Sequence, residues 1–508
     1  MKKRAAHAAP RGEMLNYYQF MVPRLNGGEI KKRFSWYRSL VRKGVAGFIV
    51  FGGELETVRT YIKKLQDEAA IPLIISADLE RGLGQQLRGG TDFPPAMALS
   101  SAYTHRAGGN RPEGHARADL APIRKAFRAV AREARYAGIN TIFAPVLDIN
   151  TNPDNPIIAA RAFGEEPGIV SLLGMEMIRV LQRERIVACG KHFPGHGDTS
   201  VDSHIRLPVL RHGMRRLRKV ELRPFVEAVD AGVGMLMLGH LGVPALDPSG
   251  IPVSLSAKAV QFIRDDMGYG GMLITDALNM GGIGRYSEEE ASSMALEAGV
   301  DLLLHPSDPG LIAAYLSKHR APCVPERVLR FRRGLGGAAK DEVPPFELHR
   351  ALAARLSAEA VSSAGRWRIA GSPLLIILND EEEEKGGALI RSMQTQFPGT
   401  RVFRLSPASG SPRIRKRTGE SMIVAIFSET RAWKGGTGRW LDRQISRFRH
   451  EADLYISFGS PYLLDGLGQA PRICAFWDAD HLQEAMPGVL KRCGTGPAGR
   501  CTRPRGRE

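Results

Sequence analysis

Between Gln19 and His305 the chain alternates short apolar, β-branched runs with longer amphipathic stretches. The runs have the length and composition of buried strands. They are Gln19–Pro23, Gly47–Phe51, Pro72–Ala77, Thr141–Leu147, Ile186–Gly190, Val233–Gly239, Met272–Thr275 and Val300–His305. The stretches between most of them repeat apolar positions three or four residues apart, as a helix with one buried face does. They are Glu54–Ala69, Leu120–Ala137, Ile169–Arg183, Leu217–Ala231, Ala257–Met267 and Glu288–Ala298.

This alternation predicts a parallel sheet, because each helix returns the chain to the end of the sheet where the next strand begins. Eight strand–helix repeats predict that the sheet closes into a (β/α)8 barrel of the TIM type. An open, doubly wound sheet is the alternative, but no Gly-x-Gly-x-x-Gly motif follows an early strand. In a barrel the reactive residues follow the carboxyl ends of the strands, so polar residues there are the candidates for a site.

After Pro306 the pattern changes. Pro325–Gly334 and Phe346–Ala364 have the pattern of helices in a connector. A smaller α/β sandwich-like unit follows, with strands expected at Leu374–Leu378, Arg401–Leu405, Met422–Phe427 and Asp453–Phe458. We therefore expect a basic N-terminal extension (1–13), a catalytic (β/α)8 barrel (14–310), a helical connector (311–366), a second α/β domain (367–490) and a disordered basic tail (491–508).

The charge is distributed unevenly along the chain. The formal net charge is +18, and residues 1–50, 401–450 and 491–508 carry all of this excess, so that the rest of the chain is net acidic. No zinc finger and no basic stripe interleaved with aromatic residues accompanies these three windows. We therefore expect solvated surface with a general affinity for anionic polymers, and no specific nucleic-acid partner.

The location of the protein is predicted from its apolar segments. Met1-Lys2-Lys3-Arg4 has the charge of a signal-peptide start, but no apolar segment follows it. The most apolar stretch, Gly232–Leu246, contains His240 and Pro244 and is too short to span a bilayer. The five cysteines (189, 323, 474, 493 and 501) form no motif, which favours free thiols in a reducing compartment. These features predict a cytoplasmic protein with no membrane partner; the sequence does not indicate its oligomeric state.

Residues 191–204 concentrate more chemistry than any other part of the chain. They hold three histidines, two aspartates and a lysine, with Pro194, Gly195 and Gly197 to bend the backbone. Because the apolar run Ile186–Gly190 precedes them, they form a loop that leaves a buried strand, where α/β enzymes carry their functional groups. Lys191 and His192 stand at the strand end, where rigidly held side chains can grip a polar ligand.

Asp202 and His204 are two residues apart, so in an extended segment both point to the same side. A carboxylate beside an imidazole fixes its tautomer and stabilises the imidazolium, as an acid/base catalyst requires. The alternative is a loop whose polar residues only satisfy turn hydrogen bonds. A metal site is not expected, because His192, His196 and His204 lack a standard ligand spacing and no cysteine pair accompanies them. No cofactor is expected either.

Carboxylates also end other predicted strands. Asp78 and Glu80 follow the third strand, Asp148 the fourth and Asp276 the seventh. A carboxylate directly after a buried strand costs desolvation unless it is hydrogen-bonded or functional. Each alone could be a helix N-cap, but several that converge on one face of a barrel favour a site.

Together these segments resemble glycoside hydrolase family 3, and in particular its bacterial β-N-acetylglucosaminidases. The likeness runs from about residue 14 to 310 and continues faintly into the second domain, at Ser457–Tyr462. The Asp202-Ser203-His204 element distinguishes this branch from the β-glucosidases of the family. The segments that carry the resemblance are Asp78-x-Glu80, Phe143–Asp148, Arg161-x-Phe163-Gly164, Lys191–Asp198, Asp202–His204 and Thr275-Asp276.

The resemblance implies a retaining exo-β-N-acetylglucosaminidase. Asp276 would be the nucleophile, His204 the acid/base and Asp202 its partner, with histidine in place of the usual second carboxylate. Asp78, Arg161, Lys191 and His192 would hold the sugar. The implied substrates are N-acetylglucosaminides, with muropeptide fragments of peptidoglycan released in cell-wall recycling as the physiological source.

The chain also departs from the family pattern. The family commonly has Asp-x-Glu-Gly-Gly with an arginine eight residues after the aspartate, whereas this chain has Arg81 and Gln86 at those positions. This favours as an alternative a broader β-glycosidase of the β-glucosidase kind. A phosphorylase is a second alternative, since a histidine acid/base leaves the site less anionic for phosphate. A non-catalytic polyanion-binding protein is the third, suggested by the basic ends.

Overall fold

The computed structural model describes residues 15–106, 119–203, 205–335, 342–380, 383–410, 412–428 and 439–492. The predicted basic extension and most of the predicted basic tail lie outside these residues. His204, the predicted acid/base, lies outside them as well.

Seven parallel strands follow one another in chain order around one sheet. They are β2 (Arg24–Asn26), β3 (Gly47–Phe51), β4 (Ile74–Ala77), β5 (Thr141–Ile142), β6 (Val187–Phe193), β7 (Met235–Leu238) and β8 (Met272–Thr275). Beside them β1 (Met21–Val22) pairs in parallel with β9 (Leu303–Leu304). A parallel bridge between Ile274 and Leu302 joins β8 to the start of β9, and β1 leads through Pro23 directly into β2. The eight predicted strands therefore form the ring of a barrel, and the predicted fold is confirmed.

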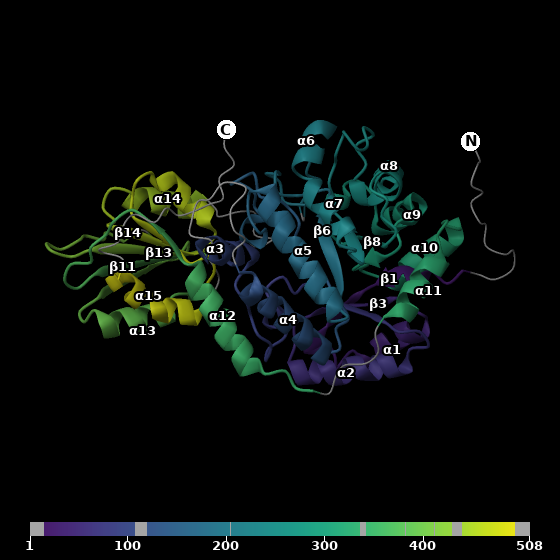
Figure 1. Cartoon of the computed structure of the whole chain (residues 1–508), viewed down its shortest axis with the longest axis horizontal. Helices are drawn as coiled ribbons and strands as arrows, with labels where there is room; N and C mark the ends of the chain where they lie inside the picture. Colours follow the sequence, from purple (N-terminus) through teal and green to yellow (C-terminus); the bar gives the residue numbers. More distant parts are fainter. Residues whose placement is uncertain are drawn as a thin grey trace.

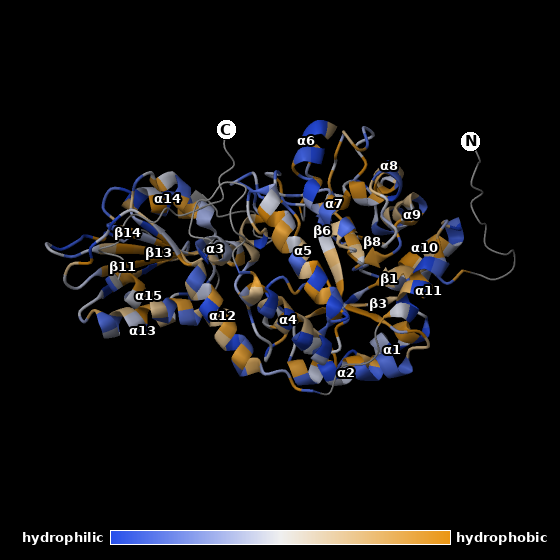
Figure 2. Ribbon diagram, viewed as in Figure 1, coloured by the Kyte–Doolittle hydropathy of each residue, from blue (hydrophilic) through white to orange (hydrophobic). Residues whose placement is uncertain are grey.

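Helices surround this ring (Figure 1). Those that the sequence pattern predicts bury an apolar side; α4, for example, buries Ile123, Ala126, Phe127 and Val130. Figure 2 shows the strands as largely hydrophobic and the helices as mixed, with polar residues on their outer sides. The helices are α1 (Phe34–Arg42), α2 (Leu55–Glu68), α3 (Ala96–Arg106), α4 (Ala121–Tyr136), α5 (Pro167–Arg183), α6 (Met214–Lys219), α7 (Arg223–Asp230), α8 (Ala257–Gln261), α9 (Glu288–Ala298), α10 (Pro309–His319) and α11 (Pro325–Gly334).

The second unit is a six-stranded sheet with helices on both faces. Its strands lie in the order β10 (Ser362–Ala364), β15 (Arg472–Cys474), β14 (Leu454–Gly459), β13 (Met422–Ser428), β11 (Leu374–Asn379) and β12 (Arg401–Leu405). All neighbours are parallel except the edge strand β10, which runs antiparallel to β15. Ile376 faces α14 (Arg439–Phe448), whereas Ile377 faces α13 (Gly387–Gln396) and α15 (Asp480–Arg492). This is the predicted α/β sandwich, whose central strands are apolar throughout because both faces are covered.

One predicted helix is too long. The helix expected over Phe346–Ala364 ends at Ala360 as α12 (Phe346–Ala360), and the next residues form strand β10. The sequence also gave no sign of β15. Both strands are three residues long and have no apolar alternation, so only their pairing in the folded sheet makes them strands.

The helix α12 connects the two units and packs along α3 and α4 of the barrel. Its His349 Nδ1 lies 2.7 Å from Oε1 of the fully buried Glu133 on α4. At its other end, the Ser101 hydroxyl of α3 donates a 2.8 Å hydrogen bond to the Ala360 carbonyl. Met97, Ala98 and Ala102 of α3 belong to the same apolar cluster as the core of the second sheet, so the two units share a core.

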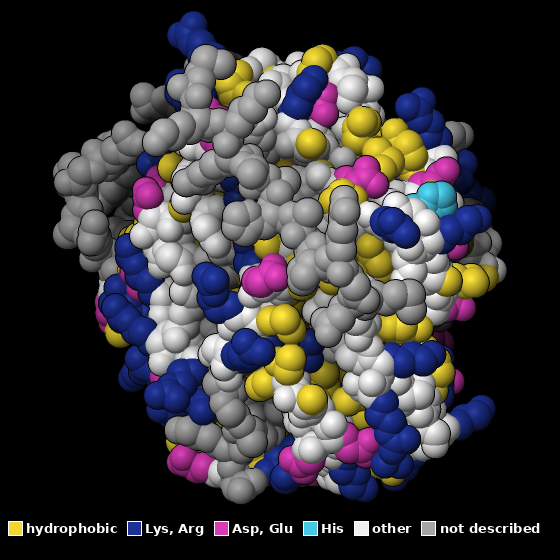
Figure 3. Space-filling view, turned by 90° about the vertical axis from the view of Figure 1, so that its right-hand side faces the viewer, with side chains coloured by type: hydrophobic (Ala, Val, Ile, Leu, Met, Phe, Trp, Pro, Cys, Tyr) yellow, Lys and Arg dark blue, Asp and Glu magenta, His cyan; other side chains and the backbone are white. Residues whose placement is uncertain are grey.

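The basic side chains are dispersed where they can be seen. Figure 3 shows the face that lies on the right in Figure 1, with the described Lys and Arg spread among apolar and acidic side chains. Within the described ranges, no helix combines the length and apolarity that a membrane crossing requires.

Candidate active site

Four charged residues form one network at the carboxyl ends of β4 and β6. The Lys191 ammonium lies 2.6 Å from Oδ1 of Asp78 and 2.6 Å from Oε1 of Glu80. Arg161, from a short 3-10 helix (Ala159–Arg161), donates to both oxygens of Glu80, at 2.9 Å from Nε and 2.8 Å from Nη2. Lys191 and Glu80 are 2% and 7% exposed, whereas Asp78 and Arg161 are 27% and 25% exposed. The buried pair therefore supports two accessible polar groups.

The charges in this network hold each other ionised. Burial alone would raise the pKa of Glu80, but the charges of Arg161 and Lys191 hold that pKa well below its ordinary value. Burial alone would lower the pKa of Lys191, but Asp78 and Glu80 raise it above its ordinary value. The network thus presents fixed charges and oriented hydrogen-bond groups, which suit a polyhydroxylated ligand better than proton transfer does.

His192 is held by a second buried carboxylate, Asp148. The Oδ2 atom of Asp148 lies 2.7 Å from Nδ1 of His192. Its Oδ1 accepts the backbone N–H groups of His196, at 2.7 Å, and of His192, at 3.2 Å. Burial raises the pKa of Asp148, but His192 and the hydrogen bonds lower it by more, so the carboxyl stays ionised. With Nδ1 bound to Asp148, Nε2 is the ring nitrogen that His192 can offer to a ligand.

His196 is kept neutral by its surroundings. It is 1% exposed, and burial lowers its pKa to about 4 despite the opposing charge of Asp148. Its Nδ1 lies 2.7 Å from the Thr199 hydroxyl, and the Asn155 amide donates to its carbonyl at 2.8 Å. These contacts fix the start of the loop that follows β6.

Asp276 lies directly after β8, on the same side of the barrel. Its backbone N–H donates to the Leu238 carbonyl of β7 at 2.9 Å, and its Oδ1 accepts the Ala277 N–H at 2.8 Å. The side chain is half-buried. Its negative charge raises the pKa values of both His196 and Cys189, which places it within electrostatic reach of β6 and its loop.

The loop after β6 crosses the barrel towards β8. Gly197 lies against the Ile149 backbone, where a Cβ would stand 1.9 Å from the carbonyl oxygen. At the far end, the Ser203 carbonyl lies 2.7 Å from the point where a Cβ of Gly282 would be, six residues after Asp276. This path brings the buried Asp202 close to the segment that follows β8.

The chain at Asp202 begins a turn, so the extended segment on which the expected pairing is based is not found there. The Asp202 carbonyl accepts the N–H of Ile205 at 3.1 Å and of Arg206 at 3.2 Å, which closes a turn. Asp and Ser favour such turns because their side chains compete for backbone hydrogen bonds. The proposed pairing of Asp202 with His204 therefore cannot rest on strand alternation, and it stays a prediction.

The structure brings the predicted site residues together in two groups. Asp78, Arg161 and Lys191 meet around Glu80, and His192 meets Asp148. The sequence pattern identifies Glu80 and Asp148 only as strand-end carboxylates, and it predicts no role for these two residues or for His196. The spacing of Asp78 and Glu80, two residues apart after one strand, marks both as candidates, but no local signal predicts that Lys191 and Arg161 pair with Glu80.

The two departures from the family pattern have different surroundings. Gln86 donates a 3.4 Å hydrogen bond to the Asp78 carbonyl, so it touches the backbone of the charged network. The Arg81 guanidinium instead lies 5.5 Å from the ring centre of Trp477, in the second unit. Arg81 therefore contributes to the contact between the two units.

Comparison with known proteins gives consistent matches. The model of the glycosyl hydrolase family 3 N-terminal domain matches residues 19–321. The protein named Beta-hexosaminidase A from Pseudoalteromonas piscicida is 34% identical over 256 residues, which are 47% of this chain and 41% of that protein. A Beta-hexosaminidase from Nitrosomonas eutropha is 32% identical over 241 residues, 47% of this chain and 66% of that protein. The matches thus span less than two thirds of these two relatives.

Solved structures agree over nearly the whole chain. A glycoside hydrolase family 3 beta-N-acetylglucosaminidase from Paenibacillus sp. str. FPU-7 gives a TM-score of 0.75 at 26% identity, covering 94% of this chain and 95% of that one. A beta-glucoside phosphorylase gives a TM-score of 0.80 at 18% identity, covering 97% and 94%. At that identity the second likeness concerns the fold alone.

Proposed function

The chain belongs to glycoside hydrolase family 3, and on that premise we propose that it is a retaining exo-β-N-acetylglucosaminidase. The observation that carries the proposal is the Asp78–Lys191–Glu80–Arg161 network, with the half-buried Asp276 on the same side of the barrel. The charged network can hold sugar hydroxyls, while Asp276 supplies the carboxylate that reacts. The names of the bacterial relatives, and of the solved structure from Paenibacillus, support N-acetylglucosaminides as the substrates.

In this mechanism Asp276 attacks the anomeric carbon of the terminal sugar. The bond to the glycosidic oxygen breaks as a covalent glycosyl-enzyme forms. His204, partnered by Asp202, gives a proton to the departing oxygen and then takes one from the water that releases the sugar. The hydrogen bond from the Ala277 N–H to Asp276 supports the role of a charged nucleophile, because it favours the ionised carboxylate.

The four proposed binding residues contact different parts of the sugar. Asp78 and Arg161 are the accessible members of the charged network, so they are placed to meet ring hydroxyls. Lys191 sits behind Asp78, and His192 offers Nε2 beside them. Hydrogen bonds from buried charged groups to a sugar hydroxyl discriminate strongly against analogues that lack it.

A trapping experiment tests the nucleophile. A 5-fluoro N-acetylglucosaminide, which keeps the acetamido group at C2, or another slowly released substrate should leave its label on the peptide that contains Asp276, as read by mass spectrometry. Asp276→Asn should lose about 10⁴-fold or more in kcat/KM. Asp230→Asn, at an exposed aspartate that ends α7, is the matched control and should retain activity. Labelling of another residue would refute the assignment.

The acid/base role is tested through the leaving group. His204→Ala should slow substrates with alkyl or sugar leaving groups by about 10²- to 10⁴-fold. It should slow nitrophenyl substrates far less, because a nitrophenolate leaves without a proton. Equal loss on both kinds of substrate would exclude His204 as the proton donor.

A broader β-glycosidase is a second candidate, because Gln86 and Arg81 stand where the family pattern has other residues and Gln86 touches the Asp78 backbone. Chromogenic N-acetylglucosaminide and glucoside separate the two. Faster turnover of the glucoside would favour this second candidate. A phosphorylase would release sugar faster when phosphate is present, whereas the hydrolase should be indifferent to it.

For the physiological substrate we propose peptidoglycan fragments, cleaved in the cytoplasm during cell-wall recycling. The proposal rests on the resemblance to bacterial β-N-acetylglucosaminidases. An anhydro-muropeptide that carries terminal N-acetylglucosamine should be cleaved with a higher kcat/KM than chitobiose. The reverse preference would point to chitin-derived substrates.

A further inference from the structure

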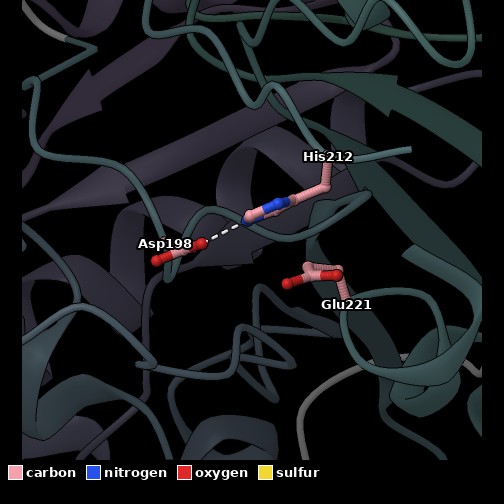
Figure 4. A group of neighbouring side chains, drawn as sticks. All are labelled: Asp198, His212 and Glu221. Atoms are coloured by element: carbon pink, nitrogen blue, oxygen red, sulfur yellow. Dashed lines mark hydrogen bonds and ion pairs between the residues drawn. The ribbon is translucent and has the colours of Figure 1, made fainter. Parts of the chain in front are cut away.

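The loop after β6 carries a second polar cluster, which the proposed mechanism does not use. Asp198 from this loop meets His212, which precedes α6, and Glu221, which lies between α6 and α7 (Figure 4). Each residue offers one nitrogen or oxygen atom, and these three atoms lie within 4.8 Å of one another. The Asp198 carboxylate is hydrogen-bonded to Nε2 of His212. The cluster shares no residue with the histidines that the sequence analysis weighed for metal.

Glu221 is the unusual member of this cluster. It is 3% exposed. Its Oε1 accepts hydrogen bonds from Arg216, at 3.2 Å from Nε and 3.1 Å from Nη2. Its Oε2 is buried and has no hydrogen-bond partner among the described residues. A buried carboxylate oxygen without a partner is unfavourable, so this atom indicates a ligand that the protein chain alone does not supply.

We propose that Asp198, His212 and Glu221 bind one divalent cation of the zinc class. Imidazole nitrogen and carboxylate oxygen are both ligands that zinc accepts, and where a protein supplies three ligands water can complete the tetrahedron. The single unpartnered oxygen of Glu221 would be its ligand atom, while Arg216 keeps the other oxygen. His212 would release Asp198 and ligate as the neutral imidazole.

The rearrangement that binding requires is small. The ligands of a tetrahedral zinc ion stand about 3.3 Å apart, given bonds of roughly 2.0–2.2 Å. The hydrogen-bonded atoms of Asp198 and His212 are closer than this, and the whole set is somewhat wider. Short side-chain rotations therefore suffice to convert the hydrogen-bonded cluster into a coordinated one.

The position of the cluster gives the cation a structural consequence. A Cβ at Gly195 would stand 3.2 Å from Cβ of Glu221, so Glu221 lies against the first turn of the loop. Asp198 is four residues before Asp202 in the same loop. A cation here would tie the loop to α6 and α7. The proposal does not depend on the glycosidase assignment, since none of the three ligands belongs to the proposed catalytic or sugar-binding set.

Metal binding can be measured without any substrate. Protein stripped with a chelator should bind one Zn²⁺ per chain in calorimetry and show a higher Tm with Zn²⁺ present. Glu221→Gln and His212→Gln should each weaken binding at least 10-fold. His319→Gln, at an exposed histidine of α10, is the matched control and should leave the affinity unchanged. The proposal would be overturned if the wild type did not bind Zn²⁺. It would also be overturned if Glu221→Gln and His212→Gln bound Zn²⁺ as tightly as the control variant.

A spectroscopic measurement on the wild type covers the case in which a variant fails to fold. X-ray absorption of the zinc-loaded protein should show nitrogen and oxygen ligands at about 2.0–2.2 Å, including one imidazole. A spectrum with sulfur ligands, or without imidazole, would place the metal elsewhere and overturn the assignment.

Discussion

Charged residues in the site are held in fixed positions because each one has one or two partners of opposite charge. Lys191 has two carboxylate partners, and Glu80 has two cationic ones. Such groups contribute little net stability, but removal of one partner leaves an uncompensated buried charge. The arrangement therefore makes the array of polar groups rigid, and it also makes the fold sensitive to the substitution of any one member.

Glu80→Gln tests this dependence. The substitution keeps the shape of the side chain but removes the negative charge between Lys191 and Arg161, so it should lower the free energy of unfolding by about 3–5 kcal/mol. Glu54→Gln is the control, since Glu54 pairs with Arg88 at the surface, where the two side chains are 57% and 77% exposed. The control should cost under about 1 kcal/mol. Urea unfolding measures both, and equal losses would contradict the prediction.

His196 gives stability a pH dependence whose sign is fixed. In the unfolded chain the His196 imidazole takes up a proton near pH 6.5, the ordinary pKa of histidine. In the folded protein it does so only near pH 4, because burial lowers the pKa of His196 to about 4. Unfolding therefore binds a proton between these values, and stability falls as the pH drops through that window. Between pH 7.5 and pH 5 this loss amounts to about 2 kcal/mol.

Comparison with His196→Gln isolates this contribution, because the other titrating groups are common to both proteins. The wild type should lose about 2 kcal/mol more than the variant between those two pH values in urea unfolding. An identical pH dependence in the two proteins would show that His196 is not the group responsible.

At the scale of elements, the loop after β6 is positioned by close backbone contact. A Cβ at Gly197 would stand 1.9 Å from the Ile149 oxygen and 2.9 Å from the Asn150 nitrogen. Gly197→Ala must therefore displace the loop, and we expect kcat/KM to fall about 100-fold, the scale of a displacement near 1 Å. Gly213→Ala is the control, since nothing lies within 4 Å of its Cβ position. Turnover within a factor of two of the control would contradict this.

Elements were predictable where local pattern and burial coincide. Gly47–Phe51 and Met272–Thr275 form strands over the predicted bounds, because each is a continuous apolar run in a covered parallel sheet. The strand predicted to end at Gly190 continues to Phe193, because the polar residues Lys191 and His192 are held buried by the site. The network around Glu80 could not be predicted, because it joins residues 81 and 111 positions apart in the chain.

At the scale of the molecule, the two units should unfold together. Ala98 on α3 is fully buried in the cluster that also contains the core of the second sheet. Ala98→Glu would place an unpaired carboxylate there, at a cost of several kcal/mol. We expect the single calorimetric transition of the wild type to split into two. Ala351→Glu, at an exposed position of α12, should keep one transition. Two transitions in the wild type would contradict the shared core.

The apolar side of α3 makes sense only with a partner sheet. In a family member built from the barrel alone, residues equivalent to Met97, Ala98 and Ala102 would face water and form an adhesive patch. Selection for solubility would replace them with polar residues. The residues of this one helix should therefore indicate, in the sequence of an uncharacterised relative, whether its barrel is a single domain or packs against a second α/β unit.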